Sequence, residues 1–199
     1  MFGFKKEYSL LSDEALMQLL STRHCNDALT EIHSRYAKKL FGFFIRMTNG
    51  NEVKSQDLVQ DLFLRILEKH QLFDSQKRFY SWVYTIASNM VKTSYREKSF
   101  VDFESDQKNM GHLVHWSDNQ NDISLFHDVL KQAIYQLEEF QRLPFILRYM
   151  EELSVKEIAE ILEISEGTVK SRLYYATRKI AKALNEFTPE QPGKEFKLS

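Results

Sequence analysis

Six polar side chains near the C-terminus have the chemistry needed to contact DNA. Cations and hydroxyl groups of this kind bind base edges and phosphates in a major groove. From position 167 to 184 the chain has basic residues at 170, 172, 178, 179 and 182 and no acidic residue. A helical hairpin with a merely solvated basic side would carry the same charges. The six candidates are Thr168, Lys170, Ser171, Arg172, Tyr175 and Lys179.

Two short helices around a tight turn are predicted to position these side chains. Ser154 followed by Glu157 is a capping-box pattern that starts the first helix, and Ser165 can cap the second. The small Ala159 permits a close crossing, and Ile164 would fill the angle at the turn. The predicted buried residues are Val155, Ile158, Ala159 and Leu162, then Val169, Leu173, Ala176 and Ile180. Together these features predict a DNA-binding helix-turn-helix.

A second candidate surface lies on a helix predicted from Ser55 to His70. Apolar residues at helical spacing predict its buried side, namely Leu58, Val59, Leu62, Phe63 and Ile66. The other side presents Asp57, Gln60, Asp61 and Arg65. From spacing alone, exposed polar residues of this kind are normally only hydrated.

Aromatic and basic residues alternate between Phe79 and Lys98. Rings stack on unpaired bases while Lys and Arg follow the phosphates, so the pattern suits single-stranded DNA. Phe79 and Trp82 fall on a predicted buried stripe, which makes core packing the better interpretation for these two and leaves Tyr80 as the freer candidate. The residues on other faces are Tyr80, Tyr84, Asn89, Lys92, Tyr95, Arg96 and Lys98.

The composition of the 199 residues bounds the fold and the class of protein. Hydrophobic residues make up 43%, while Gly at 6 and Pro at 3 are scarce, which predicts an all-α fold. The formal net charge of -1 excludes a general basic excess, so DNA binding must come from local patches. A single cysteine, Cys25, excludes an internal disulfide. No signal peptide or membrane-spanning pattern is evident, and we expect a cytoplasmic protein without membrane insertion.

Motifs for catalysis or metal binding are not evident in the sequence. Neither a phosphate-binding glycine loop nor a nucleophile elbow is found, so the chain is not expected to be an enzyme. His112 and His115 are three residues apart and His24 adjoins Cys25, but these residues lack a pattern of converging zinc ligands. We therefore expect no cofactor and no metal.

The hydrophobic pattern divides the chain into two small helical domains. The first covers residues 10–98 and the second residues 129–187. Between them, residues 99–128 carry six acidic residues and one base, Lys108, which predicts a flexible acidic linker. Residues 188–199 contain two prolines and a glycine and are expected to form a tail.

Both domains resemble bacterial sigma-70 factors of the extracytoplasmic-function (ECF) group. The segment 137–184, above all GTVKSRL at 167–173, resembles the domain that reads the promoter minus-35 element. The segment DLVQDLFLRIL at 57–67 is similar to the family's DLVQETFLRVW, the helix that docks on the clamp coiled coil of RNA polymerase. The stretch FYSWVYTIASNMVKTSYREKS resembles the region that melts and reads the minus-10 element.

This resemblance implies a role for each candidate surface. Asp57, Gln60, Asp61 and Arg65 would meet the polymerase, and the helix-turn-helix set would read minus-35 DNA. The minus-10 set would be Asp74, Ser75, Tyr80, Trp82, Asn89, Lys92 and Arg96, with the loop 74–78 capturing a flipped base. The family's common arginines are replaced by Tyr80, Thr85 and Ser88, and its usual acid by Thr93, which puts the base preference in doubt.

The partners implied by the resemblance are core RNA polymerase, through its clamp coiled coil and flap, promoter DNA, and an anti-sigma protein. In related sigma factors the linker threads the polymerase channel, so its carboxylates could mimic nucleic acid; a solvated tether is an equal alternative. A helix-turn-helix regulator with an N-terminal sensor or dimerisation domain is the main rival interpretation. A polymerase decoy is a third, although residues 79–98 argue against it.

Overall fold

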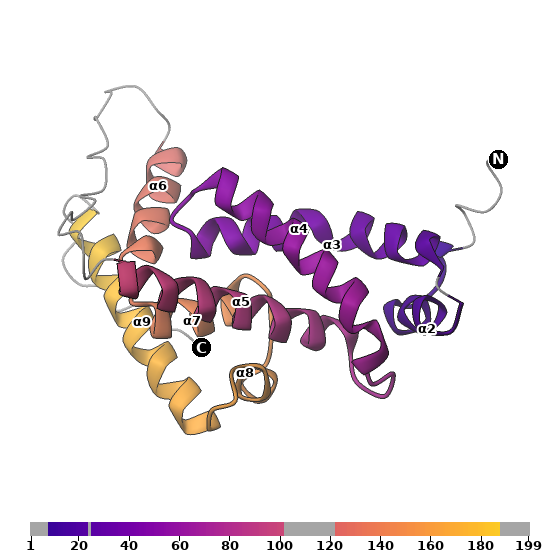
Figure 1. Cartoon of the computed structure of the whole chain (residues 1–199). Coiled ribbons are helices and arrows are strands. Elements are labelled where there is room, and N and C mark those ends of the chain that lie inside the picture. Colours follow the sequence, from indigo (N-terminus) through magenta and orange to yellow (C-terminus); the bar gives the residue numbers. More distant parts are fainter. Residues whose placement is uncertain (1–7, 24, 102–121, 188–199) are drawn as a thin grey trace.

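The computed structural model describes residues 8–23, 25–101 and 122–187. The helices are α2 (Asp13–Arg23), α3 (Asn26–Met47), α4 (Glu52–Lys69), the short 3-10 helix η1 (His70–Leu72), α5 (Phe79–Val101), α6 (Asp122–Tyr135), α7 (Glu139–Tyr149), α8 (Val155–Leu162) and α9 (Glu166–Phe187) (Figure 1). Within the described residues there is no strand, and the predicted all-α fold is confirmed.

The first four α-helices, α2 to α5, pack around an aromatic core. Helix α3 contacts α2, α4 and α5, and it contributes the fully buried Phe43 and Phe44. The ring of Tyr84, on α5, meets Phe43 edge to face with centroids 5.4 Å apart. The apolar spacing that predicted the buried side of α4 is confirmed at Val59, Leu62, Phe63 and Ile66, whereas Leu58 is half-buried.

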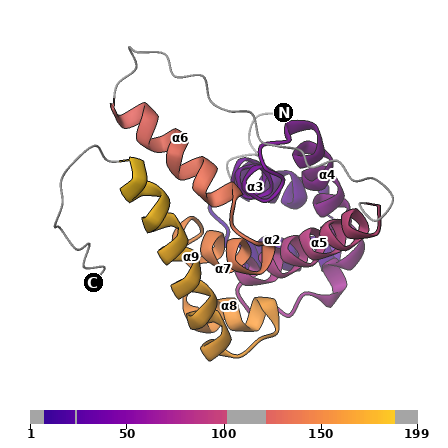
Figure 2. The same ribbon diagram turned by 90° about the vertical axis from the view of Figure 1, so that its left-hand side faces the viewer.

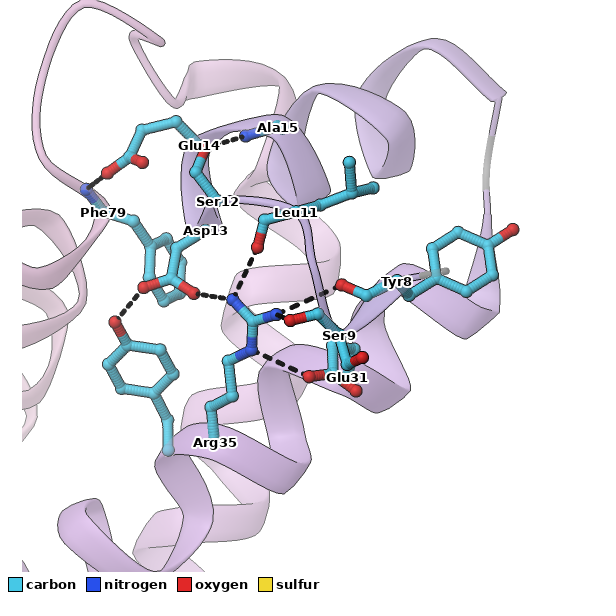
Figure 3. A network of polar contacts seen from close by, with 11 residues as sticks. Tyr8, Ser9, Leu11, Ser12, Asp13, Glu14, Ala15, Glu31, Arg35 and Phe79 are labelled. Carbon is cyan, nitrogen blue, oxygen red and sulfur yellow. Dashed lines mark hydrogen bonds and ion pairs between the residues drawn. The ribbon is translucent and has the colours of Figure 1, made fainter. Parts of the chain in front are cut away.

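A polar network anchors α2 to the rest of this body (Figure 3). The guanidinium of Arg35 donates to Asp13 (2.7 Å), to Glu31 (2.8 Å) and to backbone carbonyls that precede α2. Glu14 accepts a hydrogen bond from the backbone N–H of Phe79 at 2.9 Å. Because this N–H belongs to the unsatisfied first turn of α5, Glu14 caps the helix and fixes where the loop 74–78 ends.

Helices α6 to α9 form the second body, in which α9 packs along α6 and α7. The predicted capping box is confirmed: Ser154 Oγ accepts from the N–H of Glu157, whose carboxylate accepts from the N–H of Ser154. Glu163 takes a left-handed conformation (φ 58°) and ends α8. Ser165 Oγ accepts from the N–H of Thr168 at 3.1 Å and caps α9 as expected.

Two ends of the predicted linker are helical in the structure. Helix α5 continues to Val101 and α6 begins at Asp122. Leu130 and Ala133 of α6 pack against the core, and an acid at the first residue of a helix is favoured by the helix dipole. Residues 102–121, with most of the linker acids, and the tail 188–199 lie outside the described residues.

The two bodies pack directly against each other. Helix α8 packs across α5, and α6 and α7 contact α3 (Figures 1 and 2). The buried side chains of the two bodies form one continuous cluster. Arg142 of α7 is buried at this boundary. Its guanidinium donates to the carbonyls of Tyr135 and Leu137 in its own body and reaches Asn49 and the Tyr95 hydroxyl (3.1 Å) in the other.

Candidate polymerase and nucleic-acid interfaces

The four polar residues expected to bind polymerase are brought together on one exposed side of α4. Asp57, Gln60, Asp61 and Arg65 are all exposed. Between and beyond them the sequence analysis overlooked two apolar residues, Leu64 and Leu67, whose exposed fractions are 58% and 42%. Leu64 follows Asp57 by seven residues and Leu67 follows Gln60 by seven, and this helical spacing was the available signal. Exposed leucines among acids make this side of α4 suitable for docking on another protein.

The loop 74–78 is an ordered, exposed turn. The Asp74 carboxylate accepts from the N–H of Gln76 at 3.0 Å, and its carbonyl accepts from the N–H of Lys77 at 2.9 Å. Asp74 and Ser75 are exposed, as a base-capturing loop requires. At the end of this loop Arg78 forms a 2.8 Å ion pair with Glu157 of α8.

Tyr80, expected to be freer than Phe79 and Trp82, is half-buried beneath the second body. Its hydroxyl lies 3.1 Å from the Glu151 carbonyl and 3.2 Å from the Glu151 carboxylate. Burial and the nearby Glu151 charge raise the pKa of Tyr80 to about 12. The sequence could not reveal this cover because Tyr80 and Glu151 are 71 residues apart.

The remaining minus-10 candidates divide into core, covered and exposed residues. Trp82 is half-buried against Phe73 and Phe79, with ring centroids 5.3 and 6.0 Å away. Lys92 donates to the carbonyl of Leu162, at the end of α8, at 3.3 Å. Asn89 and Arg96 are exposed. Helix α5 thus positions the five members of the set from Tyr80 to Arg96, but α8 and the α7–α8 loop cover part of them.

Glu151, in the loop between α7 and α8, contacts this site although it was not among the candidates expected from the sequence. It is buried, and its carboxylate accepts hydrogen bonds from the hydroxyls of both Tyr80 and Tyr84. Arg46 of α3 lies 3.7 Å away. Burial and the Glu151 charge raise the pKa of Tyr84. A carboxylate immediately after a helix gives no sequence signal of its own, because such residues are usually exposed.

The minus-35 candidates lie along α9, mostly on its free side. Lys170, Ser171, Tyr175 and Lys179 are exposed. Arg172 is half-buried and lies over the Phe140 ring at 5.8 Å, and Thr168 is held by its contact with Ser165. One acid, Glu166, lies 3.8 Å from Lys170 in the first turn. The exposed part of α9 therefore presents the basic surface that major-groove binding needs.

Metal ligands do not cluster in the part of the chain that the structure describes: no group of three or more His, Cys, Asp or Glu could hold an ion there. His24, His112 and His115 lie outside the described residues. Among the described helices, none combines the length and apolarity needed to cross a lipid bilayer.

Comparison with known proteins assigns both bodies. Residues 32–101 match the family model "Sigma-70 region 2", and residues 127–180 match "Sigma-70, region 4". The ECF RNA polymerase sigma factor SigW of Bacillus subtilis is 31% identical over 171 residues, which cover 80% of this chain and 90% of SigW. The chain belongs to the ECF group of sigma-70 RNA polymerase sigma factors. The ECF sigma-E factor of Haemophilus influenzae is 28% identical over 180 residues, covering 85% of this sigma factor and 94% of that protein.

Solved structures have the same fold. The sigma factor RpoE in its complex with the anti-sigma factor NepR, from Bartonella quintana, gives a TM-score of 0.65 at 23% identity, covering 78% of this chain and 96% of RpoE. CnrH, in complex with the cytosolic domain of CnrY, gives a TM-score of 0.66 at 19% identity, and the match covers 88% of this chain and 99% of CnrH. As an ECF sigma factor the protein directs promoter-specific transcription initiation, and its family is non-enzymatic.

Proposed function

We propose that this sigma factor divides its work among three surfaces. The exposed side of α4 binds the clamp coiled coil of core polymerase, the loop 74–78 and α5 melt and read minus-10 DNA, and α9 reads minus-35 DNA. The observation that carries this proposal is the placement of the three sets on three different elements, with the α4 and α9 sets on solvent-exposed sides.

Binding to the clamp rests on the mixed chemistry of α4. Leu64 and Leu67 supply apolar area, and Asp57 and Asp61 supply charge around it. Interfaces in which apolar residues are surrounded by charged ones gain affinity from the former and specificity from the latter. The flap of polymerase is the proposed partner of the second body.

Promoter reading requires both DNA-binding bodies to be held at a fixed separation. The chain as a whole has no basic excess, since it has 27 basic and 28 acidic residues. Polymerase would supply the general phosphate attraction and hold the two bodies apart, while α5 and α9 supply the sequence reading. The linker acids are proposed to lie in the polymerase channel.

We also propose an anti-sigma protein as the inhibitor of this chain and the cytoplasm as its location. The support is that RpoE, whose fold is alike, was solved in complex with the anti-sigma factor NepR, and CnrH in complex with the cytosolic domain of CnrY. A pull-down of the tagged sigma factor from its own cells, with purified candidate partners added back, tests the first of these proposals.

Run-off transcription with core polymerase tests the α4 surface. We expect the double variant Asp57→Asn, Asp61→Asn to need at least about tenfold more sigma factor for half-maximal transcript, because two interface charges are lost. Glu52→Gln is the matched control, since five residues at 100° each place Glu52 about 140° around α4 from Asp57. Equal activity of all three proteins would contradict the α4 assignment. Loss of core dependence, with direct repeat-site DNA binding, would favour a helix-turn-helix regulator.

A further inference from the structure

An acidic loop of the second body faces a basic groove on the first. The groove, of about 630 Å³, is lined on the α3 side by Arg35, Lys38, Lys39 and Arg46, and Tyr80 of α5 borders it. Glu151 and Glu152 close it from the α7–α8 loop. Lys38 and Lys39 are exposed and make no ion pair with any described residue. The groove therefore contains more positive charge than the loop neutralises.

The groove has the composition of a binding site for single-stranded nucleic acid. The Lys39 ammonium lies 5.8 Å from the centroid of the Tyr80 ring, so a cation and an aromatic face are adjacent. Proteins that bind single strands combine this kind of stacking surface with a basic track for the phosphates. Tyr80 belongs to the proposed minus-10 set, whereas Lys38, Lys39 and Arg46 were not recognised from the sequence.

The loop presents its carboxylate to this groove in a fixed geometry. The N–H of Glu151 donates to the Ile146 carbonyl at 3.1 Å, and Arg148 donates to the Leu153 carbonyl at 3.0 Å. Glu151 then accepts from the Tyr80 and Tyr84 hydroxyls and lies 3.7 Å from Arg46. A compact anion that accepts from hydroxyls and pairs with an arginine makes the same contacts as a DNA phosphate.

Small side chains lie on the same side of α5 as Lys92, which contacts α8. Ser81, Thr85 and Ser88 are spaced four and three residues apart, and Ser88 is fully buried. Helix α8 contacts α5, and its last carbonyl, at Leu162, accepts from Lys92. Longer side chains at these positions would hold α8 away, because a packed interface has no room for added volume.

We propose that, in the polymerase-free sigma factor, the α7–α8 loop occupies the groove between α3 and α5 that the melted promoter strand occupies in the active complex. The Glu151 carboxylate takes the position of a phosphate, and Lys38, Lys39 and Arg46 are contacts for the DNA backbone. The proposal rests on the minus-10 role given to α5 above. Closure covers this groove but leaves the exposed side of α9 free.

Glu151→Gln in the full-length chain tests the occupancy. The probe is a fluorescein-labelled random-sequence single strand of about 12 nucleotides, because stacking sites tolerate any base. We expect the variant to bind it about tenfold more tightly than the unaltered protein, since opening raises the fraction of molecules that are competent to bind. Tyr84→Phe, which removes the other half of the buried contact, should act in the same direction. Glu160→Gln, the same charge change on the exposed side of α8, is the control and should change nothing.

A distance measurement separates opening from a local effect. Donor and acceptor dyes at Gln71→Cys and Ala181→Cys, in a Cys25→Ser background, report the separation of the two bodies. We expect energy transfer to fall in Glu151→Gln and to remain unchanged in Glu160→Gln. Adding Lys38→Ala and Lys39→Ala to the Glu151→Gln chain should return single-strand affinity to the unaltered level or below it.

Several results would overturn the proposal. Equal single-strand affinity of Glu151→Gln and the unaltered protein would do so, as would unchanged energy transfer between them. A gain in affinity that the two lysine substitutions leave intact would refute the groove as the binding site. These readouts need no polymerase. Failure of run-off transcription would therefore count against the proposed function and not against the occupancy.

Discussion

Removal of the Arg142 side chain should lower the stability of the fold strongly. Its guanidinium donates hydrogen bonds to the carbonyls of Tyr135 and Leu137, and to the side chains of Asn49 and Tyr95 in the first body. Burial lowers the pKa of Arg142, yet several acceptors surround its guanidinium. The guanidinium therefore stabilises the end of α6, the start of α7 and the boundary between the bodies. If it is removed, the carbonyls to which it donates remain buried without a donor.

Arg142→Leu is expected to lower the free energy of unfolding by about 3 kcal/mol, since charged hydrogen bonds are lost and their acceptors stay buried. Urea denaturation followed by far-ultraviolet circular dichroism measures this. The control Arg178→Leu, an exposed arginine of α9, should change stability by less than about 0.5 kcal/mol. Equal losses in the two variants would show that Arg142 contributes no more than a surface cation.

Glu157 makes the stability of the fold depend on pH in the acid range. Burial would raise its pKa, but hydrogen bonds from Ser154 and the Arg78 charge outweigh that effect and lower the pKa below 4.5. The charged form of Glu157 therefore stabilises the fold fully at a pH above the pKa of the unfolded state. This stabilisation is lost as the pH falls through the lower pKa of the folded state.

We expect the unaltered protein to be more stable than Glu157→Gln at pH 7, by about 0.5 kcal/mol, because the partly exposed ion pair is lost in the variant. The difference should shrink as the pH is lowered below 4.5, since a protonated Glu resembles Gln. Urea denaturation of both proteins across the acid range measures it. A difference that stays constant with pH would rule out the ion pair as its source.

At the scale of elements, α9 is the clearest case of a helix that does two tasks. Val169, Leu173, Ala176 and Ile180 bury one side, as their spacing predicts. The other side carries exposed cations with no acid between positions 167 and 184. The side chains of a helix point in different directions around its axis. The residues of α9 that pack in the core and those that are free to bind DNA can therefore lie on opposite sides.

Lys179→Ala should weaken binding of the full-length sigma factor to duplex DNA about equally for all sequences and reduce the salt slope by about 1, because one phosphate contact is lost. Fluorescence anisotropy at several salt concentrations measures both. Lys69→Ala, an exposed lysine at the end of α4, is the control and should leave the slope unchanged. An unaltered slope in Lys179→Ala would remove this residue from the minus-35 set.

At the scale of the whole molecule, two bodies with different tasks share one core cluster. Helix α8 packs on α5, and the buried contacts of Glu151 and Arg142 cross the boundary. An interface with buried polar contacts should couple the unfolding of the two bodies, whereas a bare tether would leave them independent.

Ile158→Ala, which opens a cavity in α8, tests this coupling. With Trp116→Phe as background, Trp82 in the first body is the one remaining tryptophan of two. We expect the variant to lower the urea midpoint reported by Trp82 fluorescence, with a loss of about 2–4 kcal/mol, because the buried Ile158 belongs to the shared core. If the urea midpoint of the Trp82 fluorescence transition is the same with and without the substitution, the two bodies unfold separately.

The sequence by itself determined most of the helices, the caps at Ser154 and Ser165, and most buried sides. Spacing at 3.6 residues and the capping box at Ser154 are local features, and local physics was sufficient to predict them. The exposed positions on α4 and α9 follow from the same periodicity. The linker expected at residues 99–128 stays a prediction.

Only the tertiary structure decided which of these surfaces are free. Tyr80 and Lys92 have the right chemistry and the right helix, yet contacts from Glu151 and Leu162 cover them. The same contacts make Glu151 and Arg142 important, because both side chains bond to residues of the other body. The physical reason is that burial depends on which distant segments pack together. In this chain the partners of α5 lie about 70 residues further along, beyond the reach of any periodicity.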